Sequence, residues 1–412
     1  MGLANFLSSR VKLGALTLVV TGQPPRTFGD GSGPPVRFRV SPQIAVAIAL
    51  NPWLKAGEAY TNGDLVLEEG TIFDLADLIG RNFAPDKGEG RSRGWRRIGY
   101  ALRRTFQSLN GRSASRLNVA HHYDLSVDFY RLFLDADLQY SCAYIDDAGN
   151  SLEHWQNAKK AHLAAKLCLR AGDHVLDIGC GWGGLALSLA EDWGVQVAGV
   201  TLSTEQLQTA RTQTIRRGLQ EQVRFELRDY RDVVGPFDRI VSVGMFEHVG
   251  RRNYQAYFDA IARLLADDGV ALIHTIGRSG GPGITNPWIA KYIFPGGHAP
   301  SLSEVLPSIE RAGLIITDIE VLRLHYAETL KAWGEKFTAV RSQVAAIYDE
   351  RFCRMWEFYL AFSEVSFRHD DHVNFQVQLT KRRDTLPITR DYMTTTETAW
   401  KKRRENHLSA SD

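Results

Sequence analysis

The segment VLDIGCGWGG at residues 175–184 limits the folds open to this chain more than any other stretch. Val175, Leu176 and Ile178 lead into four glycines within six positions, a pattern that predicts a buried strand ending in a tight turn. A helix is expected over residues 185–193, so that its first amides face a ligand above the turn. Glycine is needed in such a turn because a side chain would keep the backbone away from the ligand.

The glycine pattern alone leaves two ligand classes open. Three of the glycines satisfy the dinucleotide fingerprint GxGxxG, which also expects an acidic residue about 20 positions later, at the end of the second strand. The expected second strand ends instead in Thr201-Leu202-Ser203, without a carboxylate. An acid at Asp177 followed by glycines at alternate positions resembles S-adenosylmethionine-dependent methyltransferases. We therefore favour that class over NAD-binding proteins and over a purely structural turn.

Strand and helix patterns alternate from about residue 117 onward, which predicts a doubly wound α/β domain. The expected strands are residues 174–178, 196–201, 223–228, 237–243, 269–275, 315–323 and 373–379. Seven strands with a late extended segment fit the class I S-adenosylmethionine-dependent methyltransferase fold, a Rossmann-like sheet whose last strand is antiparallel.

Residues 1–80 are expected to form a small α+β domain, which the resemblance below identifies as lipid-binding. Its expected strands are 15–20, 36–40 and 64–67, its helices are 42–49 and 72–79, and residues 27–35 are expected to be a loop. The remaining predicted divisions are a basic linker or helical segment at 81–116, a catalytic domain at 117–385 and a basic C-terminal tail at 386–412.

Charge is unevenly distributed, although the net charge is only +2. Residues 91–116 hold eight arginines and no acid, interleaved with aromatic and aliphatic residues. This pattern predicts an amphipathic helix suited to an anionic membrane surface, while a solvated helix between domains remains equally open. Nucleic acid is a less favoured partner because no nucleic-acid-binding motif accompanies the charge.

Composition excludes several other classes of protein. No apolar run reaches the roughly 18 residues needed to span a bilayer, and the first 20 residues lack the apolar core of a secretory signal. The four cysteines lie far apart and form no CxxC pair, which favours free thiols in a reducing cytoplasm and predicts no metal site.

Eight collinear stretches resemble cyclopropane-fatty-acyl-phospholipid synthases and the related mycolic acid cyclopropane synthases. They are HHYDLSVDFYRLFLD (121–135), LQYSCAYID (138–146), VLDIGCGWGG (175–184), AGVTLSTEQ (198–206), FDRIVSVGMFEHVG (237–250), LIHTIG (272–277), NPWIAKYIFPGG (286–297) and HYAETLKAW (325–333). The first 80 or so residues resemble the lipid-binding domain that phospholipid-acting members carry. The family commonly has a cysteine in the late YLxxC stretch, where this chain has Ser363, so covalent cysteine chemistry there is ruled out.

The resemblance implies transfer of a methylene group from S-adenosylmethionine to a cis double bond of a phospholipid acyl chain. A carbocation forms, and loss of a proton closes a cyclopropane ring. The implied cofactor contacts are Tyr140, Ser141, Gly179, Cys180, Gly181, Thr201, Leu202, Gln206, Tyr230 and Arg231. Gln206 would take the place of the missing acid at the ribose.

Proton removal in the family uses a bicarbonate ion held in the active site. The matching positions are Glu247, His274, Tyr326, Cys142 and Ile276, with Cys142 and Ile276 acting through backbone groups. On sequence alone, His274 in ALIHTI would more often be a core histidine.

Two alternatives to cyclopropane formation remain open. The same cation can give a methyl-branched or methylene product, and the chain can be a non-catalytic lipid-binding homologue, which the joint presence of Glu247, His274 and Tyr326 disfavours. The expected partners are a membrane with anionic lipids and unsaturated acyl chains, and a second copy of the chain in a homodimer. The expected location is the cytoplasm, peripherally on the inner membrane.

Overall fold

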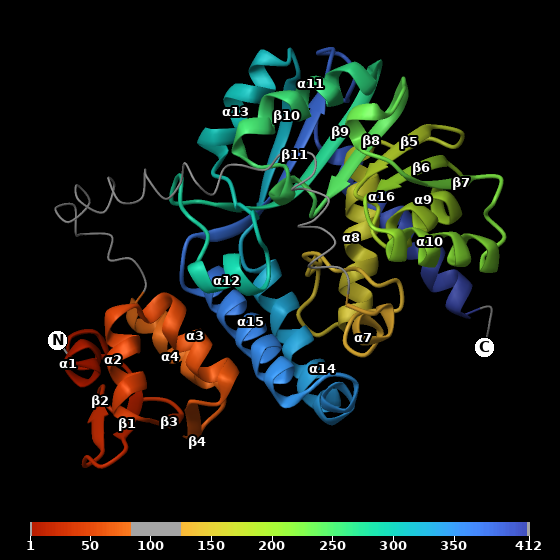
Figure 1. Ribbon diagram of the computed structural model, residues 1–412. Coiled ribbons are helices and arrows are strands. Elements are labelled where there is room, and N and C mark those ends of the chain that lie inside the picture. Colours follow the sequence, from red (N-terminus) through yellow and green to blue (C-terminus); the bar gives the residue numbers. More distant parts are fainter. Residues whose placement is uncertain (1, 84–124, 410–412) are drawn as a thin grey trace. The chain divides into compact units, whose positions relative to one another are not determined.

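The structure is a computed structural model that describes residues 2–83 and 125–409 (Figure 1). These residues gather into two compact units. The first contains residues 2–83, 284–295 and 326–372, and the second contains residues 125–283, 296–325 and 373–409. The basic segment 91–116, predicted to be an amphipathic helix, lies outside the described residues.

The first unit is built on a four-stranded sheet of order β2-β1-β3-β4. Its strands are β1 (Ala15–Val20), β2 (Arg26–Phe28), β3 (Pro35–Val40) and β4 (Leu65–Glu69), and its first helices are α1 (Leu3–Arg10), α2 (Pro42–Leu50), α3 (Pro52–Asn62) and α4 (Ile72–Phe83). The three expected strands and two expected helices are present. Strand β2 ends inside the expected loop, and helices α1 and α3 were not anticipated.

Segments from late in the sequence complete the first unit, which the contiguous domain boundaries predicted from the sequence did not foresee. They are α12 (Pro287–Tyr292), most of α14 (His325–Ile347) and α15 (Glu350–Arg368). Trp288 of α12 is fully buried, and a Cβ atom at Gly57 would lie 2.6 Å from its ring. The Tyr60 hydroxyl donates a hydrogen bond of 3.3 Å to Glu357 of α15. The first 83 residues thus pack on helices that sequence analysis assigned to the catalytic domain.

The second unit contains a seven-stranded sheet of order β10-β11-β9-β8-β5-β6-β7. Its strands are β5 (His174–Ile178), β6 (Gln196–Thr201), β7 (Val223–Leu227), β8 (Phe237–Val243), β9 (Leu265–Arg278), β10 (Ile315–Leu322) and β11 (His372–Thr380). Strands β5 to β9 pair in parallel, and β10 pairs antiparallel with β11. The expected strands and the predicted class I methyltransferase fold are confirmed.

Helices cover both faces of this sheet and bury a separate apolar cluster on each. One cluster joins the sheet to α8 (Leu152–Leu167), α9 (Gly184–Trp193) and α10 (Thr204–Arg216). The other joins it to α11 (Tyr254–Leu264) and α13 (Leu302–Arg311). Because both faces of the sheet are covered, strands such as β5 and β11 are buried along almost their whole length.

The second unit also contains short helical elements and one long helix. Among them are α7 (Val127–Arg131), the 3₁₀ turn η2 (Phe246–His248) and α16 (Asp391–Ser409). Sequence analysis expected only a basic tail where α16 lies, but Met393 and Trp400 are buried, and the Trp400 indole donates a 3.0 Å bond to Asp192. Within residues 2–83 and 125–409, no helix combines the length and apolarity needed to cross a membrane.

Candidate active site

The glycine turn after β5 places backbone amides at the carboxyl edge of the sheet, where open α/β sheets bind ligands. Gly179, Gly181 and Gly183 have φ angles of +81°, +54° and +89°, which side chains rarely allow. The amides of Gly179 and Cys180 donate bonds of 2.9 and 3.0 Å to the carbonyl of Val200 on β6, which fixes the turn on the neighbouring strand. Helix α9 then begins at Gly184, as expected.

A cavity lies directly above this turn, and all ten expected cofactor residues line it. They are Tyr140, Ser141, Gly179, Cys180, Gly181, Thr201, Leu202, Gln206, Tyr230 and Arg231. A Cβ atom at Gly181 would meet no atom within 4 Å, so the space above this glycine is open. The chain therefore holds a cradle that any side chain at Gly181 would begin to fill.

Gln206 and Thr201 form a fixed polar pair on one wall of the cavity. Ser203 caps α10 by accepting a 3.3 Å bond from the backbone N–H of Gln206. The Thr201 hydroxyl donates a 2.8 Å bond to Gln206 Oε1. The oxygen of the amide is thereby engaged, which leaves the Gln206 NH₂ group as the donor for a ligand. Its predicted role at the ribose stays a prediction.

Arg231 is held by a carboxylate that sequence analysis missed. Its guanidinium Nε donates a 2.8 Å bond to Asp229 Oδ1, and this hydrogen bond is the largest cause that raises the pKa of Arg231. Asp229 is buried and also lines the cavity. The sequence signal was available, because the DYRD stretch places an acid just beyond the third strand of the sheet, at the same edge as the glycine turn.

Glu247 lies in η2, between two residues, Met245 and His248, that line the cavity. Its Oε1 accepts a 2.6 Å bond from the Ile276 amide on β9. Its Oε2 is buried and has no partner among the described residues. Burial raises the pKa of Glu247 to about 7, and the bond from the Ile276 amide opposes that rise. The site therefore holds a carboxyl group that is near its midpoint at neutral pH.

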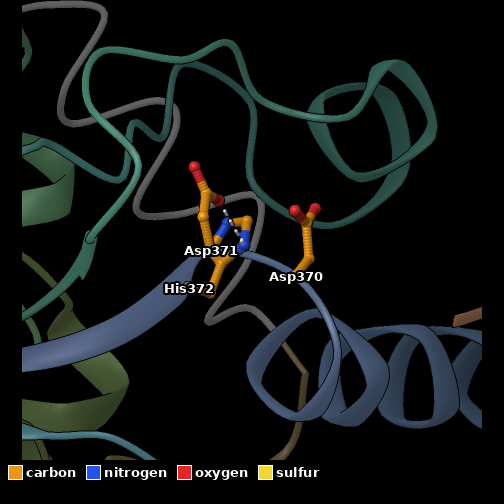
Figure 2. A group of neighbouring side chains, drawn as sticks. All are labelled: Asp370, Asp371 and His372. Atoms are coloured by element: carbon orange, nitrogen blue, oxygen red, sulfur yellow. Dashed lines mark ion pairs between the residues drawn. The ribbon is translucent and has the colours of Figure 1, made fainter. Parts of the chain in front are cut away.

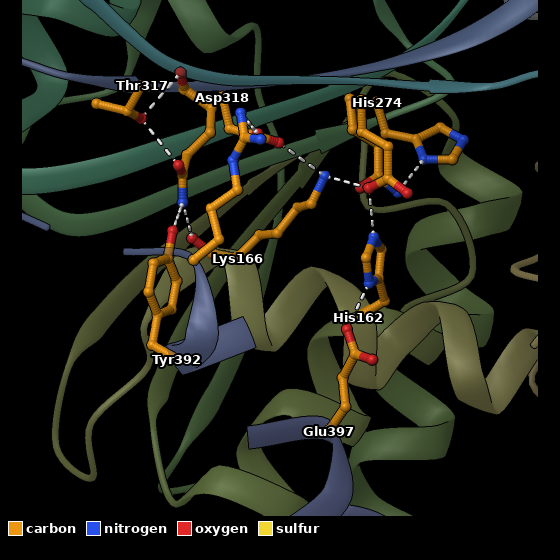
Figure 3. A network of polar contacts seen from close by, with 11 residues as sticks. His162, Lys166, His274, Thr317, Asp318, Tyr392 and Glu397 are labelled. Carbon is orange, nitrogen blue, oxygen red and sulfur yellow. Dashed lines mark hydrogen bonds and ion pairs between the residues drawn. The ribbon is translucent and has the colours of Figure 1, made fainter. Parts of the chain in front are cut away.

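His274 points toward β11 and is bonded on both ring nitrogens. Gln376 contacts Nδ1 at 3.2 Å (Figure 3), and Asn374 contacts Nε2 at 3.3 Å. Burial is the largest cause that lowers the pKa of His274, to about 3, and the Lys159 ammonium adds to the effect. His274 is thus a neutral imidazole. Among the described residues, no hydrogen bond joins it to Glu247.

The other three residues expected at the ion site lie in different places. Ile276 contacts Glu247 through its backbone amide, whereas the role expected for it was a backbone contact to the ion. Cys142 is buried, its thiol contacts the carbonyl of Ala143 at 3.3 Å, and burial raises its thiol pKa. Tyr326 belongs to the first unit, where its ring packs 4.8 Å from that of Phe367. The structure therefore brings together Glu247 and Ile276, and the roles of all five residues stay predictions.

A family model described as mycolic acid cyclopropane synthetase matches residues 111–377 of the chain. The chain belongs to this family. The match spans the glycine turn, the cavity and the η2 carboxyl group, so the described site lies entirely within the family region.

Several named proteins are similar to the chain over much of its length. A probable fatty acid methyltransferase of Pseudomonas putida is 38% identical over 351 residues, covering 82% of this chain and 86% of that protein. The cyclopropane-fatty-acyl-phospholipid synthase of Escherichia coli is 46% identical over 256 residues, covering 62% and 65%. The tuberculostearic acid methyltransferase of Mycobacterium tuberculosis is 39% identical over 325 residues, covering 76% and 75%.

Two solved structures of mycolic acid cyclopropane synthases also match. The synthase MmaA2 from Mycobacterium tuberculosis has a TM-score of 0.61 at 34% identity and covers 66% of this chain and 99% of its own. The synthase CmaA1, complexed with SAH and CTAB, has a TM-score of 0.60 at 34% identity and covers 64% and 97%.

Membership in the mycolic acid cyclopropane synthetase family makes the chain an enzyme that uses S-adenosylmethionine to methylate lipids. The residues present fit that cofactor, because the space above Gly181 is open and no protein atom occupies it. Gln206 and Asp229 line the same cavity with an amide and a carboxylate, polar groups of the kind that bind a nucleoside, and the cofactor contacts expected from the sequence stay predictions.

The sequence predicts no metal site. Among the described residues, one group of side chains has the geometry to hold a metal ion. Asp370, Asp371 and His372 offer ligand atoms within 4.8 Å of one another (Figure 2). Asp371 is paired with His372 at 3.6 Å, and Asp370 is exposed. Consecutive acidic residues at a helix end are common without an ion, so we assign no metal site to them.

Proposed function

We propose that the enzyme transfers a methylene group from S-adenosylmethionine to a cis double bond of a membrane phospholipid acyl chain, forming a cyclopropane ring. The observation that carries the proposal is the buried Glu247 carboxyl group beside the cofactor cavity, with one oxygen bonded to the Ile276 amide and the other unpartnered among the described residues. Ring closure requires loss of a proton from the substrate cation. In the proposal, the Glu247 carboxyl group holds the acceptor of that proton in the site.

The bound cofactor supplies the methyl group, and the residues of the chain position it and exclude water. An alkene is a weak nucleophile, so catalysis depends on alignment of the double bond and on a dry site in which water does not trap the cation. The apolar residues of the cavity wall, among them Leu185, Val200 and Met245, serve that exclusion.

A bicarbonate ion as the proton acceptor fits the chemistry of Glu247. Because burial raises the pKa of this carboxyl group to about 7, its protonated form can donate a hydrogen bond to an anion and its ionised form can accept one from a bicarbonate hydroxyl. The free Oε2 atom supplies the point of attachment. His274, Tyr326 and the backbone of Cys142 complete the proposed ion site.

A second candidate product is a methyl-branched or methylene acyl chain made from the same cation. It is favoured by the names of two similar proteins, a fatty acid methyltransferase and a tuberculostearic acid methyltransferase, at 38% and 39% identity. The fate of the cation distinguishes the two candidates: deprotonation gives a ring or a methylene group, whereas a saturated branch also needs a reductant.

Mass spectrometry of phospholipids from cells that express the enzyme tests the proposal. A gain of CH₂ on unsaturated chains, with cyclopropane protons in the NMR spectrum, is expected. A gain of CH₄ identifies the saturated branch and contradicts ring formation, and unchanged phospholipids with modified free fatty acids contradict the substrate class.

The Glu247→Gln variant tests the proton route, because it keeps the shape of the side chain and removes its charge. Loss of one such interaction commonly lowers turnover about 10²-fold or more, and cofactor affinity measured by calorimetry should be unchanged. Bicarbonate should raise wild-type turnover in depleted buffer. Equal turnover of wild type and variant without bicarbonate contradicts the assignment.

We also propose that the enzyme is cytoplasmic, binds peripherally to the inner membrane through anionic lipids, and forms a homodimer. The exposed apolar side chains of α2 and α3 support the membrane contact, and the homodimer rests on family resemblance alone.

A further inference from the structure

A buried lysine on α8 lies directly behind the segment that forms one wall of the cofactor cavity. Lys159 is fully buried, and its ammonium donates a 2.9 Å bond to Ser141 Oγ and a 2.7 Å bond to Gln139 Oε1. Both acceptors line the cavity. Lys159 does not itself line the cavity and acts through these two residues, and it was not among the ten residues expected at the cofactor from the sequence.

The lysine fixes the direction of the Ser141 hydroxyl. An ammonium group only donates hydrogen bonds, so Ser141 Oγ must be the acceptor in this contact. Within the described part of the chain the Ser141 hydroxyl donates to no neighbour. Its hydrogen is therefore available for an acceptor in the cavity, and a positive charge stands 2.9 Å behind it.

The rest of the wall is held rigidly in the same orientation. Gln156, also fully buried on α8, donates bonds of 3.2 and 3.0 Å to the carbonyls of Gln139 and Ser141. Leu138, which begins the wall, has a φ of +55°, a conformation that costs a non-glycine residue energy and is retained where the surroundings enforce it. The Gln139 amide donates a 2.8 Å bond to Asp135, which helps to enforce it.

The hydrogen bonds of Lys159 do not account for the burial of its charge. A buried ammonium is costly unless it is paired with a carboxylate, and both of its bonded partners are neutral oxygens. Burial accordingly lowers the pKa of Lys159 to about 7, a shift that the nearby Asp135 opposes. An anionic group in the cavity would supply the missing partner.

S-adenosylmethionine carries one anionic group, the carboxylate of its amino-acid end. We propose that Lys159 is a positioning residue that directs the Ser141 hydroxyl, backed by its own charge, toward that carboxylate. This inference rests on the cofactor assignment. Asp177, buried at the end of β5 with its Oδ2 unpartnered among the described residues, lines the same cavity. Burial raises the pKa of Asp177 to about 7, an effect that Lys159 opposes, and the ionised form of this carboxyl group suits the ammonium of the same amino-acid end.

Calorimetry with two ligands tests the inference without turnover. The probes are S-adenosylhomocysteine and its decarboxylated form, the 3-aminopropyl thioether of 5′-deoxyadenosine, which keeps the ammonium and lacks the carboxylate. Wild type should bind the first at least about 10-fold more tightly. Lys159→Met, which keeps the length of the side chain, should weaken S-adenosylhomocysteine about 10- to 100-fold, as expected for a charged hydrogen bond, and the decarboxylated ligand less than about 3-fold.

A matched control is the adjacent lysine of the same helix. Lys160 is also buried, but it pairs with Asp137, which does not line the cavity. Lys160→Met should therefore change the two affinities by the same factor. Ser141→Ala should reproduce the selectivity change of Lys159→Met, and the double variant should lose no more than either single variant, because both remove one contact.

Each result bears on the proposal. Equal loss of both ligands in Lys159→Met, with a lowered melting temperature, makes the lysine merely structural and overturns it. If Lys159→Met does not fold, Ser141→Ala and wild type still decide: equal wild-type affinity for the two ligands contradicts the inference. Failure of wild type to bind S-adenosylhomocysteine at all would instead contradict the cofactor assignment.

Discussion

Two glycines of the same turn are required for different reasons, and substitution can separate them. A Cβ atom at Gly184 would lie 2.3 Å from the carbonyl oxygen of Asp137, whereas one at Gly181 would meet nothing within 4 Å. Gly184→Ala should therefore lower the free energy of unfolding by about 1–3 kcal/mol, as overpacking does. Gly181→Val should cost mainly the strain of its φ of +54°, about 1–2 kcal/mol, and should lower cofactor affinity by about 10-fold or more because the side chain enters the cavity.

Urea titrations and calorimetry with S-adenosylhomocysteine measure the two effects. A folded Gly181→Val protein with wild-type affinity would mean that the cofactor does not approach this turn. A Gly184→Ala protein as stable as wild type would mean that the segment around Asp137 can move away from α9.

At the residue scale, the sequence predicted the site residues that belong to a motif. It missed buried polar residues that reach the cavity wall only through tertiary packing. Eight of the ten expected cofactor residues line one cavity because the glycine turn and the segments after two parallel strands meet at one edge, whereas Tyr140 and Ser141 come from a loop before α8 that only the family resemblance marked. Gln156 and Lys159, by contrast, are polar residues in a helical pattern, which ordinarily indicates a solvated face. Only the chain packed over them turns them into the rear wall of the cavity.

Helix α16 is attached to the second unit through a titratable contact on α8. His162 bonds Glu320 of β10 through Nε2 at 2.7 Å and Glu397 of α16 through Nδ1 at 2.6 Å (Figure 3). Tyr144 stacks on its ring at 4.0 Å, and Lys166 also pairs with Glu320. The hydrogen bonds to the two glutamates raise the pKa of His162 above its usual 6.5 despite burial, and these bonds join three elements.

The contact should stabilise the protein most in mildly acidic solution. The contribution of His162 is complete below about pH 6.5 and is lost as pH rises through its raised pKa. Although burial opposes the shift, His162 and Lys166 lower the pKa of Glu320 from 4.5 to about 2, so its contribution is complete above about pH 4.5 and is lost as pH falls toward 2. Glu397→Gln should thus lower the free energy of unfolding by about 1–3 kcal/mol at pH 6, and by less at pH 9.

Urea unfolding at both pH values measures this difference, and Asp384→Asn is the control. Asp384 pairs with Arg382 at 2.7 Å in an exposed position, so its loss should have little effect at either pH. A destabilisation by Glu397→Gln that is the same at pH 6 and pH 9 would contradict the role given to His162.

At the element scale, regular periodicity was enough for the large sheet and insufficient for short or polar elements. All seven strands were predicted because each has apolar residues in a run or in alternation between turn residues. Strand β2 has three residues in a glycine- and proline-rich stretch, and α16 is mostly polar with two buried anchors, Met393 and Trp400. Such elements form through tertiary contacts that no local pattern records.

At the scale of the whole molecule, the compact units are not continuous stretches of the sequence. The predicted boundary near residue 80 assumes that a unit is one continuous stretch, but residues 284–295 and 326–372 cluster with the first unit. Contacts such as Trp288 over Gly57 join positions far apart in sequence. The family match at 111–377 crosses these segments as well, so the residues shared with relatives contribute to both units.

The first unit also carries an apolar surface that suits contact with a lipid bilayer. Val46, Leu50 and Trp53 of α2 and α3 are 57%, 81% and 51% exposed, and residues 41–54 contain no charged side chain. Tryptophan and leucine on a helical surface insert at the boundary of head groups and acyl chains. Leu50→Ser with Trp53→Ser should weaken vesicle binding about 10- to 100-fold, since each side chain contributes about 1–2 kcal/mol on burial in the membrane.

Co-sedimentation with phospholipid vesicles measures this loss, and Ile388→Ser, at an exposed apolar residue of the second unit, is the matched control. The control should bind as wild type does. Salt separates the two parts of the interaction, because screening weakens attraction to anionic lipid and leaves apolar insertion nearly unchanged. Wild type in high salt should therefore still bind more tightly than the double variant. Equal binding of the double variant and the control would place the membrane contact elsewhere on the molecule.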